Sequence, residues 1–413
     1  MATRRVLLVT PTMPAADTNG LAMRAGLLLE GLACHADVTL DVVPVFGDPP
    51  AWSAFVRDRT GSRQVLGLHD ATTAVAAPAR DRSLDALRLA MRPALSRMVG
   101  PTLVDTVRRQ LAGGGFTHFI VMRSYLAPLL ASADGMHLRT WLDLDDDEVE
   151  TRRQIAALHE GRGEPALAAE ARTDADRFLV LEDEWVRRTD ALSVCSEADR
   201  LRVGGRTGHP AVFVVPNGAP LHARMRPSAR DGTDAVRLLF VGSFGYLPNA
   251  DAAVFLCREV LPRLRQRLDR RIEVLLVGTR PPEWIRALAG DDVTVHADVP
   301  DVAPYYRSAT MALAPVRAGG GSRIKILEAF ALGVPVVATP AGAAGLEVEH
   351  GRHLLIGDTA DAVAACCARV ADDPALAAQL VDHAACLVRH SHTAAAITQR
   401  LGAVLDALDA SAR

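Results

Sequence analysis

The sequence predicts two doubly wound, Rossmann-like α/β domains that face each other across a cleft. Three observations support this fold class. The chain of 413 residues exceeds the usual size of one domain and fits two. Short apolar segments alternate with segments of helical periodicity through both halves. A Pro216-Asn217-Gly218 turn and the polar segment 219–235 separate the halves.

The domain boundaries follow from this division. We assign residues 1–218 to an N-terminal domain, 219–235 to a linker and 236–392 to a C-terminal domain, which a final amphipathic helix at 393–413 follows.

The first domain opens with a strand at Arg5–Thr10, a loop, and a helix that starts after Gly20 and covers Leu21 to Cys34. In such domains, ligands bind beyond the carboxyl ends of the strands. Further strands are expected at 37–45, 116–122, 140–144, 190–196 and 211–215, and helices at 148–158, 178–189 and 197–203. A basic amphipathic stretch, 83–99, fits packing with a solvated basic face, and contact with the cleft or with a membrane surface is the alternative.

The second domain repeats the alternation. Strands are expected from 236 up to Gly242 and at 272–278, 293–297, 311–315, 334–338 and 355–356. Helices are expected at 249–256, 303–308, 323–332, 359–370, 374–388 and 393–408.

The most informative stretch of the chain is 311–345, MALAPVRAGGGSRIKILEAFALGVPVVATPAGAAG. An apolar strand is followed by three glycines, Gly319 to Gly321. Helical periodicity then runs from Arg323 to Leu332, and Lys325 and Glu328 lie away from its apolar face.

This layout indicates a site for a diphosphate. A helix start offers unpaired N–H groups and a partial positive charge, and preceding glycines let a ligand approach the backbone. Arg323 and Lys325 add two full positive charges in the first turn, where they oppose the helix dipole, so a bound anion would offset their cost. Glu328, about one and a half turns further on, could accept hydrogen bonds from a ribose diol. A tight turn with two solvated basic side chains is the alternative.

The segment GGGSRIKILEAFALGVPVVATPAGAAGLEV resembles the donor-site block of family 4 glycosyltransferases, which have the GT-B fold. Many members of that family carry two glutamates eight positions apart. Glu328 matches the second glutamate, and Gly320 stands at the position of the first. A sub-branch with a glycine-rich loop, an arginine and a lysine before the second glutamate shows the same departure.

The resemblance implies transfer of a sugar from a nucleotide-diphosphate sugar to an acceptor hydroxyl, with retention at the anomeric carbon. It also implies that no metal is needed, because the donor domain stabilises the departing diphosphate electrostatically. The first domain would carry the acceptor, and the final helix would cross back onto that domain.

Site residues follow from the motif and from the strand ends. We assign catalytic roles to Glu328, Arg323, Lys325 and Asp145. The predicted donor contacts are Gly242, Ser243, Phe244, Gly245, Asp298, Val299, Gly320, Gly321, Ser322, Arg323, Ile324, Lys325 and Glu328. The predicted acceptor-side residues are Asn19, Gly20, Arg123 and Asp145.

Two features differ from the family pattern. Relatives have basic residues near Gly242, where this chain has Tyr246-Leu247-Pro248, so Arg323 and Lys325 would supply that charge. Relatives often place a histidine at a strand end near the acceptor. His118 instead starts its strand, so we assign no catalytic histidine.

Two patterns suggest a metal only weakly. Asp143-Leu-Asp145 matches a D-x-D motif that binds divalent cations in another glycosyltransferase fold. The same residues introduce a helix, where acidic side chains are stabilising without a metal, or could serve the acceptor side of the cleft. His390 and His392 are an isolated pair between helices. We therefore predict no metal.

Composition limits the remaining classes. The net charge of −3 gives no basic field for nucleic acid. No stretch of 18 apolar residues occurs, so we expect at most peripheral membrane contact. The start, MATRRVLLVTPTMP, is typical of a first strand rather than of a signal peptide. Six cysteines without disulfide or metal spacing favour a reduced, cytoplasmic protein.

The expected partners are a nucleotide-sugar donor, which is a substrate rather than a cofactor, and a small-molecule, glycan or lipid-linked acceptor. No cofactor is expected. A nucleotide-sugar epimerase of the same fold and a non-catalytic nucleotide-binding or scaffold subunit are the alternatives.

Overall fold

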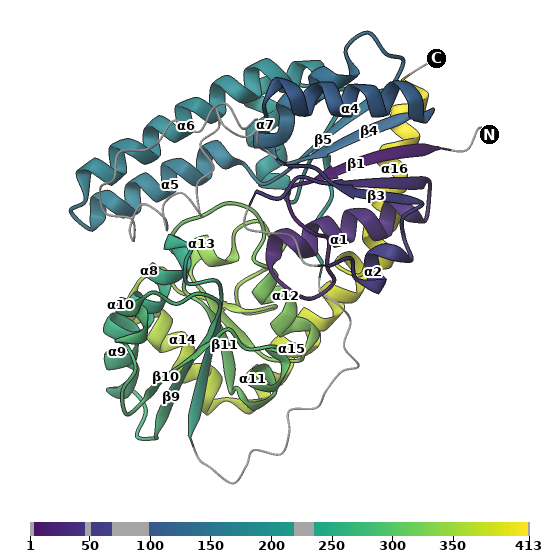
Figure 1. Cartoon of the computed structure of the whole chain (residues 1–413). Helices are drawn as coiled ribbons and strands as arrows, with labels where there is room; N and C mark the ends of the chain where they lie inside the picture. Colours follow the sequence, from purple (N-terminus) through teal and green to yellow (C-terminus); the bar gives the residue numbers. More distant parts are fainter. Residues whose placement is uncertain (1–3, 46–50, 68–98, 219–234, 412–413) are drawn as a thin grey trace. The chain divides into compact units, whose positions relative to one another are not determined.

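The computed structural model describes residues 4–45, 51–67, 99–218 and 235–411, which divide into two compact units (Figure 1). The first comprises Met1–Arg153, Ala169–Asn217 and Ala394–Arg413, and the second Gln154–Ala168 and Gly218–Thr393. Residues 83–98 of the basic amphipathic stretch and 219–234 of the predicted linker lie outside the described residues.

The first unit is built on a parallel sheet that has seven strands among the described residues, in the order β3-β2-β1-β4-β5-β6-β7. They are β1 (Arg5–Thr10), β2 (Asp37–Val42), β3 (Ser62–Val65), β4 (His118–Met122), β5 (Arg139–Asp145), β6 (Ala191–Val194) and β7 (Val212–Val214). Central strands are mainly apolar, as in the Val6–Val9 part of β1 and the Phe119–Met122 part of β4, because both faces are covered. The strand order reverses between β1 and β4, which is where such sheets bind ligands.

Helices flank this sheet, and parts of two of them, residues 154–168, belong to the second unit. The helices are α1 (Gly20–Ala33), α2 (Ala54–Arg57), α4 (Pro101–Gly114), η2 (Ser124–Ala133), α5 (Glu148–Gly161), α6 (Pro165–Trp185), η3 (Val186–Arg188), α7 (Glu197–Thr207) and α16 (Ala394–Ala410). Helix α16, the last of the chain, packs along α1 (Figure 1). A Cβ atom on Gly31 would lie 2.3 Å from Leu401, and one on Gly402 2.7 Å from the ring of His35. The two glycines therefore allow the close helix contact.

The second unit contains a parallel sheet of six strands among the residues described, in the order β10-β9-β8-β11-β12-β13. The strands are β8 (Val236–Val241), β9 (Ile272–Gly278), β10 (Val293–Ala297), β11 (Met311–Ala314), β12 (Val336–Ala338) and β13 (Leu355–Ile356). The helices are α8 (Leu247–Phe255), η4 (Leu256–Val260), α9 (Leu261–Arg265), α10 (Glu283–Arg286), α11 (Ala303–Ser308), α12 (Ile324–Ala331), α13 (Pro340–Ala343), α14 (Ala360–Asp372) and α15 (Pro374–Ser391).

The two sheets confirm the predicted fold class, and several strands agree with the prediction residue for residue, such as β1 and β9. The helices agree less well. Helix α6 begins at Pro165, whereas the sequence predicted a helix only from Phe178, and α4 was missed. The first half of α6, PALAAEARTDADR, is rich in alanine and charge and has few bulky apolar side chains to mark its buried face.

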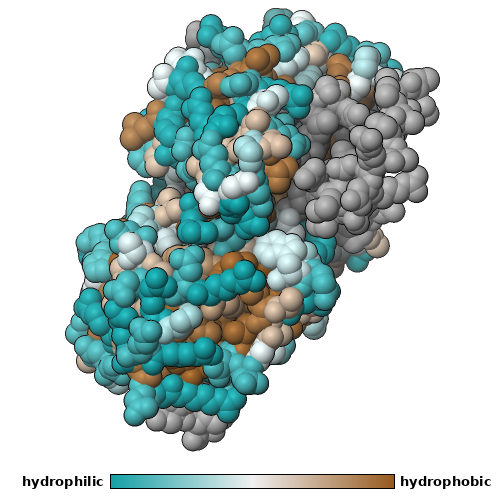
Figure 2. Space-filling model, turned by 90° about the vertical axis from the view of Figure 1, so that its left-hand side faces the viewer, coloured by the Kyte–Doolittle hydropathy of each residue, from teal (hydrophilic) through white to brown (hydrophobic). Residues whose placement is uncertain are grey.

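Hydrophilic residues cover most of the face shown in Figure 2, with smaller hydrophobic areas between them. Large hydrophobic side chains that are strongly exposed are Val65, Val180, Leu201 and Trp284. In the described part of the chain, no helix combines the length and the apolar character needed to cross a membrane.

Candidate active site

The glycine loop and the start of α12 lie at the carboxyl end of β11. Gly319 and Gly321 have positive φ angles, 116° and 69°, which glycine adopts without strain. Gly345 also has a positive φ, and a Cβ atom there would lie 2.7 Å from the carbonyl oxygen of Gly321. The loop is therefore held in a tight shape that other residues would disrupt.

Arg323 is the N-cap of α12, and no side chain caps the helix. Its guanidinium donates hydrogen bonds to the carbonyl oxygens of Gly319, at 2.7 Å, and of Gly320 and Ala341. The sequence predicted that this charge faces a bound anion. The structure instead shows the guanidinium bonded to its own loop, where it fixes the backbone that would receive a ligand.

Lys325 lies in the first turn of α12. Its Nζ donates to Oδ1 of Asn249 at 2.8 Å and lies 4.4 Å from the ring centre of Phe240. Burial, and to a smaller extent the charge of Arg323, lower the pKa of Lys325 to about 7, and Glu328 opposes both effects. Burial therefore weakens the full positive charge that the sequence predicted here, because the protein around Nζ removes much of its hydration.

Glu328 lies one turn further along α12. The hydroxyl of Tyr306 donates to Oε2 of Glu328 at 3.2 Å and to the carbonyl oxygen of Lys325 at 3.1 Å. Burial raises the pKa of Glu328 to about 7, against the opposing effects of the Tyr306 hydrogen bond and of Lys325. Two ionisable groups with strongly shifted pKa values thus lie on one helix, as is common at functional sites.

The loop after β8 lies beside Lys325. A Cβ atom on Gly242 would lie 3.0 Å from Nζ of Lys325, so glycine leaves room for the amine. The Oγ of Ser243 is buried and has no hydrogen-bond partner among the residues described. Phe244 is 1% exposed and packs edge-on against Phe240, so its side chain belongs to the core and is not available to a ligand.

The other predicted donor contacts lie in separate places. Asp298 follows β10, has a φ of 52°, and accepts a hydrogen bond from the backbone N–H of Arg280 at 3.0 Å. Val299 packs against the core of the second unit. The remaining predicted contacts, Gly245, Gly320, Ser322 and Ile324, are partly exposed.

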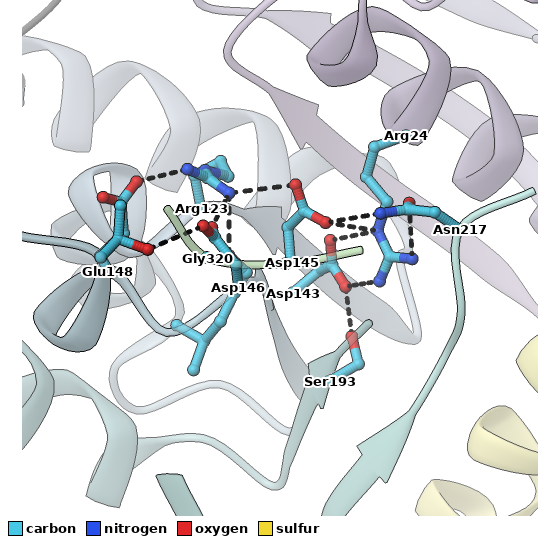
Figure 3. A network of polar contacts seen from close by, with 12 residues as sticks. Arg24, Arg123, Asp143, Asp145, Asp146, Glu148, Ser193, Asn217 and Gly320 are labelled. Carbon is cyan, nitrogen blue, oxygen red and sulfur yellow. Dashed lines mark hydrogen bonds and ion pairs between the residues drawn. The ribbon is translucent and has the colours of Figure 1, made fainter. Parts of the chain in front are cut away.

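The first unit has a polar network at the carboxyl ends of its strands (Figure 3). Arg24, on α1, and Asp143, on β5, are both fully buried and form an ion pair, with Nη2 2.5 Å from Oδ1 and Nε 3.1 Å from Oδ2. The hydroxyl of Ser193 donates to Asp143 at 2.5 Å. Arg24 also donates to the carbonyl oxygen of Val215 and to Oδ1 of Asn217.

Asp145 and Arg123 are the partly buried part of this network (Figure 3). Arg123 Nη1 donates to Oδ2 of Asp145 at 3.0 Å, and Nδ2 of Asn217 donates to Oδ1 at 3.2 Å. Arg123 also pairs with Asp146 and Glu148. Burial raises the pKa of Asp145 to about 6, although Arg123 and Arg24 oppose that effect.

The other two predicted acceptor-side residues, Asn19 and Gly20, form the start of α1. Asn19 accepts a hydrogen bond from the N–H of Ala22 at 3.1 Å and so caps α1, which Gly20 begins. Sequence reasoning missed Arg24 and Asn217. An arginine among the apolar residues of α1 was the available signal for Arg24.

The structure also bears on the histidine and metal patterns. His118 is buried at the start of β4, with Nε2 3.4 Å from Asp409. Both oxygens of Asp143 are bonded to Arg24 or Ser193, so the D-x-D pair serves the ion-pair network. His390 is exposed and His392 buried. Among the described residues, no group of three or more potential ligands could hold a metal ion.

Comparison with known proteins identifies part of the chain. Residues 235–373 match a family described as "Glycosyl transferases group 1". No curated protein sequence matches the chain significantly.

Solved structures resemble the whole chain. Sucrose-phosphate synthase from Thermosynechococcus elongatus has a TM-score of 0.69 at 18% identity, over 99% of this chain and 100% of that chain. HepE from Anabaena, solved with UDP and glucose, has a TM-score of 0.64 at 13% identity, over 98% and 100%. TarM from S. aureus, solved as a mutant with fondaparinux, α-GlcNAc-glycerol and UDP, has a TM-score of 0.67 at 8% identity, over 98% and 100%.

These comparisons define the class of protein. The two Rossmann-like units have the GT-B fold of these structures, and the second unit contains a glycosyltransferase group 1 domain. The protein is a glycosyltransferase.

Proposed function

We propose that the protein is a family 4 glycosyltransferase of the glycine-loop sub-branch, which transfers a sugar from a nucleotide-diphosphate sugar to an acceptor hydroxyl, with retention and without a metal ion. The observation that carries this proposal is the start of α12. There, a glycine loop and an uncapped helix start adjoin Lys325 and Glu328. Such a start binds anions through its N–H groups and its dipole.

In this proposal, the diphosphate lies against the backbone of Gly320, Gly321 and Ser322 and the first turn of α12. Glu328 accepts hydrogen bonds from the ribose diol. The leaving diphosphate gains negative charge as the sugar departs, and fixed N–H groups with Lys325 stabilise it. HepE was solved in complex with UDP-glucose, which makes that nucleotide sugar the first donor to test.

On the acceptor side, Asp145 is the proposed contact or base for the acceptor hydroxyl. Its two oxygens are held by Arg123 and Asn217, which fixes the carboxylate at the end of β5. We propose a small-molecule, glycan or lipid-linked acceptor, a cytoplasmic location and at most peripheral membrane contact.

Thermal shifts with UDP-glucose, GDP-mannose and dTDP-glucose test donor binding, and nucleotide release with an acceptor panel tests transfer. We expect one donor to raise the melting temperature and acceptor-dependent release to survive EDTA. Loss of activity on chelation, restored by Mn²⁺ or Mg²⁺, would contradict metal independence. Isomer exchange of the donor without acceptor would instead identify an epimerase, and donor binding without any transfer a non-catalytic subunit.

A further inference from the structure

Lys325 is the only lysine in the chain. The sequence has 46 lysine and arginine residues, and the other 45 are arginine. Arginine stays charged under all ordinary conditions, whereas the pKa of a lysine shifts readily when its amine loses water. The one lysine or arginine side chain whose charge can change near neutral pH therefore lies in the first turn of α12.

The groups in direct contact with the amine of Lys325 carry no charge. Nζ contacts the amide oxygen of Asn249 on α8 and the ring face of Phe240 on β8. Gly242 leaves the space next to Nζ free of a side chain. In the described part of the chain, Lys325 forms no ion pair with a carboxylate.

The ionisable groups around Lys325 come from two helices. Helix α12 supplies Arg323, whose guanidinium is bonded to loop carbonyls, and Glu328. Helix α11 supplies the hydroxyl of Tyr306, which donates to Glu328. Asn249, on α8, and Phe240, on β8, carry no charge. Burial brings the pKa values of both Lys325 and Glu328 to about 7. The free protein thus has, at this site, an amine and a carboxyl that are each partly ionised at neutral pH.

We propose that the donor site takes up a proton from solvent when a nucleotide-diphosphate sugar binds, and that Lys325 receives it. The proposal rests on the proposed function. The diphosphate brings the negative charge that Lys325 lacks in the empty site. The neutral amine and a solvent proton then form an ammonium, which donates charge-assisted hydrogen bonds to the phosphate oxygens.

Glu328 changes little in this step because two effects on it oppose each other. The ligand's negative charge disfavours ionised Glu328, whereas the new ammonium of Lys325 favours it. At pH 7.5, an amine with a pKa near 7 is about one quarter protonated, so binding takes up about 0.7 of a proton. Because the bound state holds more protons, donor affinity falls as pH rises, by about tenfold between pH 7 and 8.5.

A single lysine allows a direct measurement. Protein with ¹⁵N- and ¹³C-labelled lysine and no lysine in its tag gives one side-chain amine signal, which is titrated alone and with saturating UDP-glucose, GDP-mannose or dTDP-glucose. A nucleotide sugar is the right ligand because both of its phosphates are diesters, unlike the terminal phosphate of a nucleoside diphosphate, which itself titrates near pH 6. We expect a midpoint near pH 7 in the free protein and above pH 9 in the complex.

Calorimetry of donor binding in PIPES, HEPES and Tris at pH 7.5 gives the number of protons bound. The three buffers differ in their heat of ionisation, so any proton that the complex takes up from the buffer makes the measured heat differ between them. Wild type should show uptake of about 0.7 proton, and Lys325→Arg, whose charge is permanent, uptake near zero with an affinity independent of pH. Glu328→Gln is the matched control and should keep most of the uptake.

Three outcomes would contradict the proposal, and they separate it from the proposed function. A free-protein lysine signal that titrates above pH 9 overturns the proposal alone. Donor binding with equal heats in all three buffers does the same. Failure of every nucleotide sugar to bind overturns the proposed function, and the proton uptake with it.

Discussion

The carboxyl ends of the two sheets use charge in different ways. In the first unit, Arg24 and Arg123 are paired with carboxylates from β5 and the start of α5, so the charges largely neutralise one another. In the second unit, the corresponding edge offers glycines, a helix start and one lysine whose positive charge is suppressed. Carboxylates neutralise the cations of the first edge, whereas the amine of Lys325 on the second edge contacts the amide of Asn249 and the ring of Phe240.

Backbone strain marks both edges. Of the described residues other than glycine, four have a positive φ, namely Arg123, Asp145, Arg280 and Asp298. All four lie at or just after the carboxyl ends of strands β4, β5, β9 and β10. Such conformations cost about 1–3 kcal/mol each and persist where the surroundings enforce them, often at functional sites. The difference between the edges is therefore one of charge and not of backbone rigidity.

The largest expected effect is on stability and concerns the buried ion pair of Arg24 and Asp143 in the first unit. Arg24→Leu leaves Asp143 buried without its cation and should lower the free energy of unfolding by about 3–5 kcal/mol, measured by urea denaturation. The exposed Arg187→Leu is the matched control and should change it by less than about 0.5 kcal/mol. A loss below about 1 kcal/mol for Arg24→Leu would show that water reaches Asp143 and that the ion pair is not buried.

The second prediction concerns the loop before α12. Arg323→Ala removes the guanidinium that bonds the loop carbonyls, and should weaken donor binding and kcat/KM together by about 1.5–3 kcal/mol. Arg258→Ala, an exposed arginine of the same unit, should leave both unchanged. If Arg323→Ala lowers turnover but keeps donor affinity, the guanidinium acts on the chemical step rather than on the shape of the loop.

Glu328 gives the third prediction. If it accepts from the ribose diol, Glu328→Ala should reduce kcat/KM by about 1–3 kcal/mol. Glu328→Gln keeps an oxygen acceptor and should lose less. Steady-state kinetics with varied donor distinguish the two variants. Turnover within twofold of wild type for Glu328→Ala, at unchanged donor affinity, would refute the assignment.

The donor side could be predicted from sequence because it is local. The strand, the glycines, Arg323, Lys325 and Glu328 occupy one continuous stretch, and α12 lies within one residue of its predicted limits at each end. The fold class was also predictable, because the buried parallel strands are mainly apolar and alternate with helical segments.

The first-unit network could not be predicted in the same way. Arg24 and Asp143 are 119 residues apart in sequence, and Asn217 is 193 residues from Arg24. Only the order of strands in the sheet brings them together. The lowered pKa of Lys325 could not be predicted from sequence either. It depends on the burial of the amine beside Asn249 and Phe240, which belong to other elements of the fold.

The smallest expected effect tests whether Asp145 belongs to the acceptor side. Asp145→Asn keeps the shape of the side chain and removes its charge. Arg123 and Asn217 donate to different oxygens of Asp145, so the single amide oxygen can serve one of these two donors. Calorimetry should show nucleotide affinity within about twofold of wild type, because Asp145 lies in the first unit and the proposed diphosphate contacts in the second. Acceptor-dependent turnover should fall, since the carboxylate is the proposed base or contact for the hydroxyl. Arg323→Ala, measured in parallel, should show the opposite pattern for nucleotide binding. A large loss of nucleotide affinity in Asp145→Asn would show that Asp145 belongs to the donor site. The assignment of the strand ends of the first unit to the acceptor and of those of the second unit to the donor would then be wrong.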